Sequence, residues 1–303
     1  MQIHLPIAEM AVDPFVIIAI GAGVGFVSGL FGVGGGFLLT PLLMFTGVPA
    51  AIAVSTQANQ VLATSIAGAA AHGRNRAVDR RMGSYMLIGG MTGSALGVWV
   101  FRLLKESGDI DVAITISYVL FLGIIGGLMF WESVIAVRKP SGGDPKRRHA
   151  LRQWTRILPF KRRFPRSGLY ISLIPPILIG FFVGFLAAVL GVGGGFILAP
   201  AMVYLLGVPT RVMVGTSLFQ IIFLTAFVTF LQAAVNQTVD IVLAVILMLG
   251  GVVGARLGVA ANQYLNAAQL RLLLSIVVLA MGAKLAFDLF FGDTAAFTLE
   301  VLT

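Results

Sequence analysis

The sequence predicts an all-α integral membrane protein built from two inverted repeats of about five hydrophobic segments each. Three observations support this fold class. Of the 303 residues, 58% are hydrophobic and 11% are charged, whereas soluble domains carry about 25% charged residues. Long apolar segments follow one another in both halves, and a glycine-rich motif recurs at matching places. Because such a chain cannot cover a water-facing surface, we expect it to lie in a lipid bilayer.

Each half holds five apolar segments between polar loops. The first half has residues 14–31, 33–46, 51–72, 83–104 and 111–137, and the second has 171–190, 192–206, 212–234, 240–262 and 268–291. A spanning helix needs about 20 residues, so the short second segment of each half is a candidate re-entrant helix. We therefore expect a membrane repeat over residues 1–137, a basic linker over 138–168 and a second membrane repeat over 169–303.

The two halves repeat one another in sequence. Residues 25–41 and 184–200 agree at 10 of 17 positions. Further matches follow in the same order along both halves, at Thr56 and Thr216, Gln60 and Gln220, and Asp79 and Asp240. Because five segments per half is an odd number, the second half should enter the membrane in the opposite orientation. The glycine-broken or re-entrant helices should then meet near the midplane.

The positive charge is concentrated in two loops. The net charge is +9, and fifteen of the 21 Lys and Arg residues lie within residues 73–82 and 138–168. Cytoplasmic loops of membrane proteins carry such an excess, so we place both loops inside. The acidic termini and the loops at 106–111 and 236–240 should then lie outside. Basic loops beside a membrane contact anionic lipid, so we expect lipid rather than nucleic acid as their partner.

Several classes of chemistry are excluded by what the sequence lacks. It contains no cysteine, and therefore no disulfide or thiolate metal site. It shows no nucleophile elbow, metalloprotease motif or paired carboxylates, so we expect no enzyme, metal or cofactor. A phosphate-binding loop is excluded as well, because no Lys-Ser or Lys-Thr follows the glycines.

The repeated glycine clusters are the first candidate substrate site. They interrupt apolar segments, and irregular backbone at membrane depth lines a cavity or is buried in protein. If helices restart after the glycines, their free N–H groups and positive dipole ends would attract a small anion. The alternative is close helix packing through small residues. The candidate residues are Gly34, Gly35, Gly36 and Phe37, with Gly193, Gly194, Gly195 and Phe196.

A polar stripe on the third segment of each half is the second candidate. Thr56 and Gln60 are four residues apart and share one helix face, as do Thr216 and Gln220. Hydroxyl and amide groups can bind oxyanion oxygens without a buried charge. The alternative is hydrogen bonding between helices or back to their own helix. Gln57, Asn59 and Ser217 complete the stripe.

Other conspicuous residues are more readily explained by structure. Asp79 and Asp240 precede the fourth segments, where N-caps belong, although a proton relay is the alternative. Arg256 could attract an anion or reach the interface, and His72 could act in gating. Small residues four apart on the fourth segments favour close helix packing, and these are candidate surfaces on which the two halves rock. They are Gly89, Gly93 and Gly97, with Gly250, Gly254 and Gly258.

The glycine motifs also resemble those of a known family. The run at residues 29–37, its copy at 190–196, the closing Pro41 and Pro200, and the Gly-Val-Pro turns that follow are similar to the TauE/SafE family of sulfite exporters. The resemblance implies a bacterial inner-membrane transporter that exports sulfite, an organosulfonate or a related small anion. The alternatives are a transporter of another solute, such as a carboxylate, metal or cofactor, and a non-transporting membrane assembly factor that works through the basic linker.

Overall fold

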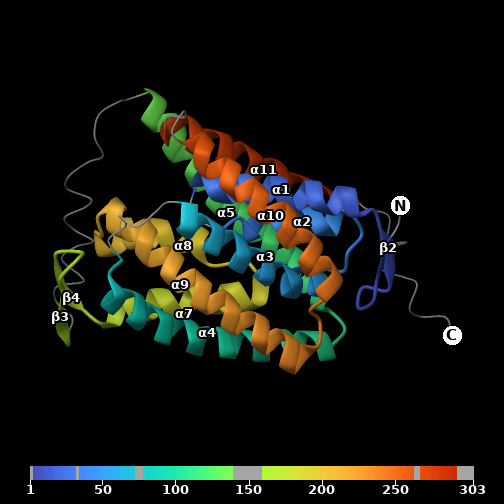
Figure 1. The fold of residues 1–303 in the computed structure, drawn as a ribbon, viewed down its shortest axis with the longest axis horizontal. Helices are drawn as coiled ribbons and strands as arrows, with labels where there is room; N and C mark the ends of the chain where they lie inside the picture. Colours follow the sequence, from blue (N-terminus) through green and yellow to red (C-terminus); the bar gives the residue numbers. More distant parts are fainter. Residues whose placement is uncertain (1–2, 32–33, 72–77, 139–158, 263–266, 292–303) are drawn as a thin grey trace.

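The computed structural model describes residues 3–31, 34–71, 78–138, 159–262 and 267–291. In the first half these residues form helices α1 (Pro14–Phe31), α2 (Gly36–Phe45), α3 (Ala50–Ala71), α4 (Arg80–Glu106) and α5 (Ile110–Arg138). The helices lie roughly along the long axis of the molecule (Figure 1). Every segment predicted for this half therefore coincides with a helix.

The second half repeats this order with two π-helical turns added. Its elements are α7 (Ile174–Leu190), α8 (Gly195–Pro200), η1 (Ala201–Leu206), α9 (Thr210–Leu231), η2 (Gln232–Asn236), α10 (Ile241–Asn262) and α11 (Ala267–Phe291). Within the described part of the chain, six helices are long and apolar enough to cross a membrane. These are α1, α4, α5, α9 with η2, α10 and α11. The protein is thus a mostly helical, multi-pass membrane protein, as the composition predicts.

Two short β-hairpins were not predicted. Strands β1 (Ile3–Leu5) and β2 (Met10–Val12) precede α1, and β3 (Lys161–Phe164) and β4 (Leu169–Ser172) precede α7. Strands of this length are too short for an alternating pattern to be recognised. Strand β3 lies within the predicted linker 138–168, and β4 lies at the start of the predicted second repeat. Residues 139–158 of the linker lie outside the described part of the chain. The two hairpins lie at opposite ends of the molecule (Figure 1).

Helices of the first half pack against helices of the second half. α1 packs against α10, and α4 packs against α7, while α3 contacts α9 and α5 contacts α11. The α4–α7 contact is built on glycine. A Cβ added to Gly89 or Gly93 would overlap the carbonyl oxygens of Ile177 or Phe181, and one added to Gly180 would overlap that of Met86. The two helix backbones therefore touch directly, which confirms the predicted packing role of this ladder.

The α1–α10 pair is built in the same way. A Cβ on Gly254 would overlap the Ala22 carbonyl oxygen, and one on Gly25 would overlap that of Gly251. We call these two helix pairs the glycine zippers. Each zipper joins one helix of the first half to one helix of the second, so neither half is a separate body.

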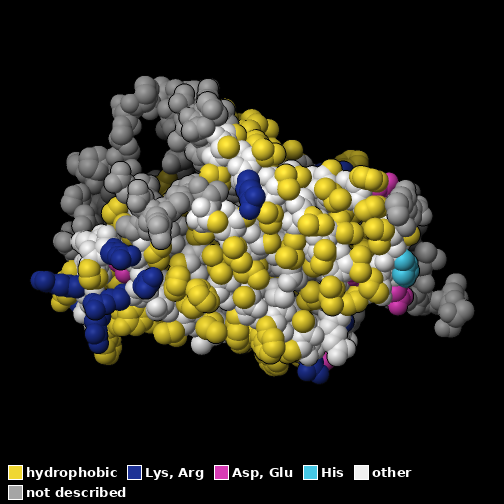
Figure 2. All heavy atoms as spheres, in the orientation of Figure 1, with side chains coloured by type: hydrophobic (Ala, Val, Ile, Leu, Met, Phe, Trp, Pro, Cys, Tyr) yellow, Lys and Arg dark blue, Asp and Glu magenta, His cyan; other side chains and the backbone are white. Residues whose placement is uncertain are grey.

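The surface agrees with a membrane location. Apolar side chains cover the middle of the face shown in Figure 2, and Lys and Arg gather at the β3–β4 end. The exposed basic side chains of that hairpin are Lys161, Arg162, Arg163 and Arg166. Exposed apolar side chains on so large a scale need a nonaqueous environment. The lipid bilayer supplies that environment.

Candidate functional site

The glycine clusters are the starts of two helices, as predicted. α2 begins at Gly36 after Gly35, and α8 begins at Gly195 after Gly194. In both copies the N–H of the first helical glycine donates to the carbonyl two residues earlier, at N–O distances of 2.7 Å and 2.9 Å. The matched Gly34 and Gly193 have φ of +66° and +69°. Side chains rarely tolerate this conformation, which explains why glycine stands at both positions.

The two helix starts meet in the interior. The rings of Phe37 and Phe196 stack with their centroids 4.1 Å apart, and both side chains are buried. A Cβ added to Gly36 would lie 2.9 Å from the carbonyl oxygen of Gly191. The N-terminal ends of α2 and α8 therefore approach one another, and each carries a partial positive charge. We call this region the central site.

Helix α3 lines the central site with residues that we did not predict. Val61 lies between the two breaks. Its Cγ1 would be 3.2 Å from a Cβ added to Gly34 and 2.8 Å from a Cβ added to Gly193. The buried hydroxyl of Ser65 would be 3.7 Å from the same Gly34 Cβ, and it has no hydrogen-bond partner among the described residues. The sequence could have indicated Ser65, because it matches Thr225, another hydroxyl residue, at the same offset that relates Thr56 to Thr216.

The two threonines of the polar stripe contact the ends of helices from the other half. Thr56 Oγ1 accepts a hydrogen bond from the backbone N of Asp240, and Thr216 Oγ1 accepts one from the backbone N of Asp79, both at 3.0 Å. The contacts are matched in the two halves. They connect α3 to the start of α10 and α9 to the start of α4, and no described contact places either hydroxyl at the glycines.

The two aspartates are N-caps, which confirms that expectation. Asp79 Oδ1 accepts from the Met82 N–H at 3.2 Å, and Asp240 Oδ1 accepts from the Leu243 N–H at 3.0 Å. Their second oxygens bind the β-hairpin loops. Asp79 Oδ2 accepts from the hydroxyl of Ser167 at 2.8 Å and from its backbone N at 3.1 Å, while Asp240 Oδ2 accepts from the backbone N of Ile7 at 3.0 Å. We call these contacts the hairpin latches, one at each end.

The matched glutamines lie on the glycine zippers. Gln60 Nε2 donates to the Gly21 carbonyl of α1 at 3.2 Å, and Gln220 Nε2 donates to the Met86 carbonyl of α4 at 3.4 Å. Both side chains are fully buried. Gln57 is different, because its Nε2 donates to the carbonyls of Leu190 and Gly191 at the second break. Of the three, only Gln57 has a described contact with a glycine break.

No described contact places the remaining predicted residues at the glycine breaks. Asn59 Nδ2 donates to the Thr56 carbonyl at 3.3 Å, and Ser217 Oγ donates to the Val214 carbonyl at 3.1 Å, so each binds its own helix. Arg256 is exposed on α10. His72 lies outside the described residues. Roles for these four in binding or gating remain predictions.

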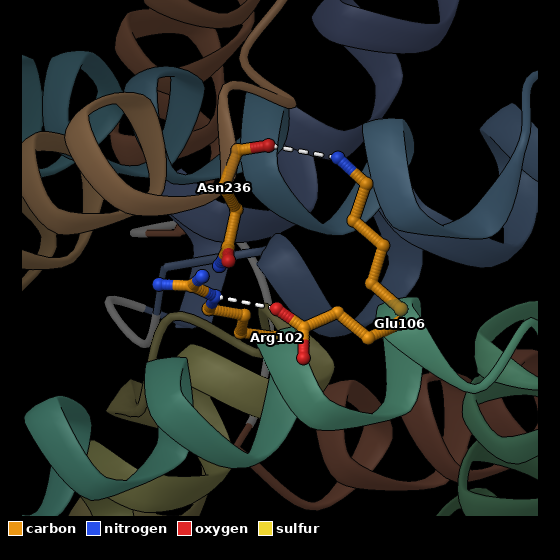
Figure 3. Close-up of polar contacts among 4 residues, drawn as sticks. Arg102, Glu106 and Asn236 are labelled. Carbon is orange, nitrogen blue, oxygen red and sulfur yellow. Dashed lines mark hydrogen bonds and ion pairs between the residues drawn. The ribbon is translucent and has the colours of Figure 1, made fainter.

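A polar cluster near the β1–β2 end joins α4 to η2. Lys105 Nζ donates to the Asn236 carbonyl at 2.8 Å, beside the Arg102–Glu106 ion pair (Figure 3). The lysine supplies a positive charge to the carboxyl end of η2, where carbonyls lack helical partners. Asn236 Nδ2 in turn donates to Gln232, and Gln232 Nε2 donates to the Ala188 carbonyl at 3.0 Å.

The comparisons with known proteins decide the family. The sequence model of the family described as "Sulfite exporter TauE/SafE" matches residues 17–285. The chain belongs to the TauE/SafE family. Because this is a family of membrane transporters, the protein is a membrane transporter and not an enzyme. No solved structure matches the chain.

Curated relatives of this TauE/SafE protein have similar lengths. It is 27% identical to "Probable membrane transporter protein YunE" of Bacillus subtilis, with 90% of this chain and 97% of the relative covered. It is 29% identical to YjnA of the same organism, with 89% and 98% covered. It is 24% identical to MJ0441 of Methanocaldococcus jannaschii, with 93% and 98% covered. All three carry the description of a probable membrane transporter, and none names a solute.

Proposed function

We propose that this protein exports a small sulfur-containing anion, sulfite or an organosulfonate, across the bacterial inner membrane by alternating access. The observation that carries the proposal is the meeting of two matched helix starts at the Phe37–Phe196 stack. Two positive helix ends directed at one buried point form an anion site that needs no buried basic side chain. Glycine at both breaks lets the anion approach the backbone closely.

The orientation of the repeats follows from the same elements. The two hairpins lie at opposite ends, and each precedes the first helix of its half (Figure 1). The short α2 ends beside its own hairpin, because a Cβ on Gly47 would lie 3.6 Å from Met10 of β2. This supports a re-entrant α1–α2 pair and an inverted second half. The basic β3–β4 end would then be cytoplasmic, and both termini periplasmic.

The hairpin latches are the proposed gates. Each latch ties a hairpin and a threonine of one half to the fourth helix of the other half, and both are closed in this structure. Since the glycine zippers prevent the halves from separating, we propose that the α1–α10 pair moves against the α4–α7 pair around α3 and α9. Opening one latch at a time would expose the central site to one side only.

Flux measurements in proteoliposomes test the proposal. The membrane potential drives a monovalent anion outward by about 2.3 kcal/mol per 100 mV, so export needs no coupling ion. We expect saturable flux of labelled sulfite driven by potential alone, with competition by organosulfonates and none by acetate. Flux that requires a proton gradient would contradict uniport, and saturable flux of another solute class with none of sulfite would contradict the substrate.

Variants of the glycine breaks test the position of the central site. Gly194→Val places a branched side chain at φ +73° and 2.5 Å from Val183 Cγ1, so we expect loss of flux. Gly35→Val should do the same, because its Cβ would lie 2.7 Å from the Val24 carbonyl oxygen. A Cβ added to Gly68 on α3 would have no atom within 4 Å, and Gly68→Ala is the control. Normal flux from both valine variants would exclude the glycine breaks as the site.

A further inference from the structure

A buried polar cluster distinguishes the first half from the second. It consists of Thr40 on α2, Gln57 on α3 and Tyr118 on α5, all fully buried. The hydroxyl of Tyr118 lies beside the side chains of Thr40 and Gln57. We call these three residues the acceptor cluster.

Two donors of the cluster, the Tyr118 hydroxyl and the Gln57 amide nitrogen, are already engaged. The Tyr118 hydroxyl donates to the Leu190 carbonyl, and Gln57 Nε2 donates to the carbonyls of Leu190 and Gly191. These carbonyls end α7, where the last C=O groups have no partner within the helix. Because a carbonyl can only accept, the amide of Gln57 is held with its nitrogen toward α7 and its oxygen pointing away.

One atom of the cluster is left without a partner. Gln57 Oε1 is buried and has no hydrogen-bond partner among the described residues, whereas the Thr40 hydroxyl lies within hydrogen-bonding reach of the Tyr118 hydroxyl. A buried polar atom without a partner is unfavourable by an amount comparable to a lost hydrogen bond, so a ligand group that donates to it would be stabilised there. Gln57 Oε1 can only accept, whereas the Thr40 hydroxyl can also donate.

The electrostatics of the cluster differ from those of the helix starts. The carboxyl end of α7 carries partial negative charge, and the Gln57 oxygen adds a further acceptor. A bare oxyanion oxygen is therefore disfavoured here and favoured at the starts of α2 and α8. What fits the acceptor cluster is a hydroxyl hydrogen on the same ligand.

The second half lacks the same groups. In the repeat alignment Thr40 corresponds to Ala199, and Gln57 corresponds to Ser217. The framework contacts described above are matched between the halves, including the zippers, latches and helix starts. The acceptor cluster is not, so it is an addition to one half rather than a requirement of the repeated fold.

We propose that the acceptor cluster is a subsite that recognises an O–H group on the transported anion, with Gln57 Oε1 as the acceptor. The favoured substrates are then oxyanions that carry a hydroxyl or an acidic proton, such as hydrogen sulfite or a hydroxylated sulfonate. The inference rests on the proposed function, because it assumes that the anionic group lies at the adjacent helix starts.

A matched pair of sulfonates tests the subsite. Isethionate and ethanesulfonate share the sulfonate group and differ by one hydroxyl. We expect the wild-type protein to transport isethionate about tenfold more efficiently, the factor that one buried hydrogen bond supplies. Equal transport of the two would overturn the subsite and leave the proposed anion export standing. Absence of flux and of ligand-induced thermal stabilisation with both sulfonates and with sulfite would overturn the proposed function and the subsite together.

Variants that copy the second half locate the subsite. Gln57→Ser and Thr40→Ala introduce the residues found at Ser217 and Ala199. We expect either variant to bring the ratio of isethionate to ethanesulfonate transport close to one. Thr92→Ala is the control, since Thr92 is exposed and binds only carbonyls of its own helix. Persistent flux with an unchanged preference in both variants would show that the acceptor cluster is not the subsite.

If the variants lose all flux, binding to the purified protein decides the question. The shift of the thermal midpoint with each sulfonate then reports recognition without transport. A wild-type protein stabilised more by isethionate, and variants stabilised equally by both, would support the subsite. Variants that keep the larger shift with isethionate would overturn it.

Discussion

At the scale of single residues, the most informative positions are Asp79 and Asp240. Each caps a helix with one carboxylate oxygen and binds a hairpin loop of the other half with the second. Substitution of a residue that makes two structural contacts should destabilise the protein more than substitution of a surface residue. These aspartates therefore control both the stability of the molecule and the proposed gates.

We expect Asp79→Ala and Asp240→Ala each to lower the free energy of unfolding by about 2–3 kcal/mol, because each loses a cap and a buried hydrogen bond. Ser167→Ala should have a smaller effect, about 1 kcal/mol, because its backbone N–H still binds Asp79. Unfolding in detergent measures all three. Glu106→Ala is the control, since its ion pair with Arg102 is exposed. Equal effects at Asp79 and Glu106 would show that the latch contributes nothing.

The cluster in Figure 3 allows a second prediction at this scale. Lys105 binds the partly buried end of η2, whereas Arg102 makes only an exposed ion pair with Glu106. Lys105→Met should therefore destabilise by about 1 kcal/mol, and Arg102→Met by less than about 0.5 kcal/mol. Thermal unfolding of the two variants, compared directly, would test the order. The reverse order would contradict the role assigned to Lys105.

At the scale of elements, the glycine zippers are the dominant feature. Their helices approach so closely that backbone atoms occupy the positions where side chains would begin. Such a contact has no room to adjust, because packed interiors tolerate little added volume. The zippers should therefore behave as rigid units during transport.

We expect Gly93→Ala to destabilise the protein by about 2–3 kcal/mol, because the methyl group overlaps the Phe181 carbonyl and forces α4 from α7. Gly23→Ala on α1 provides a matched comparison, since nothing lies near its Cβ position. There the same change should stabilise by about 0.5–1 kcal/mol through higher helix propensity. Unfolding by detergent denaturation measures both. A neutral Gly93→Ala would mean that the zipper is looser than described.

At the scale of the whole molecule, we expect the charge distribution to set the orientation in the membrane. The exposed basic residues of β3–β4 and the start of α4 share one end, because Ser167 binds Asp79 and Arg166 donates to the Val78 carbonyl at 2.8 Å. The loops at 106–111 and 236–240 share the other end through the Lys105–Asn236 contact. The described parts of loops that we expect on the same side of the membrane therefore contact one another, and the topology itself stays a prediction.

Thiol labelling would establish which end is cytoplasmic. The natural sequence has no cysteine, so a single introduced thiol gives an unambiguous signal. In spheroplasts we expect a membrane-impermeant maleimide to label Asp109→Cys and to label Arg162→Cys only after permeabilisation, because the basic end should be inside. Both residues are exposed, so accessibility within the fold is matched. The opposite labelling pattern would reverse the proposed topology.

The sequence by itself determined the membrane class, the helical segments, the repeat and the glycine breaks. All of these depend on hydrophobicity and local conformation, which are properties of short stretches of chain. It also predicted that Asp79 and Asp240 are caps, because a cap is recognised from the residues beside it.

Only the tertiary structure decided which polar groups meet. The sequence could not show that Thr56 and Thr216 bind the caps of the opposite half, that Gln60 and Gln220 lie on the zippers, or that Gln57 turns its oxygen away from α7. Each of these contacts joins residues more than thirty positions apart, and most cross between the halves. The direction of a buried amide depends on the carbonyl that faces it, and the facing helix is known only once the chain has folded.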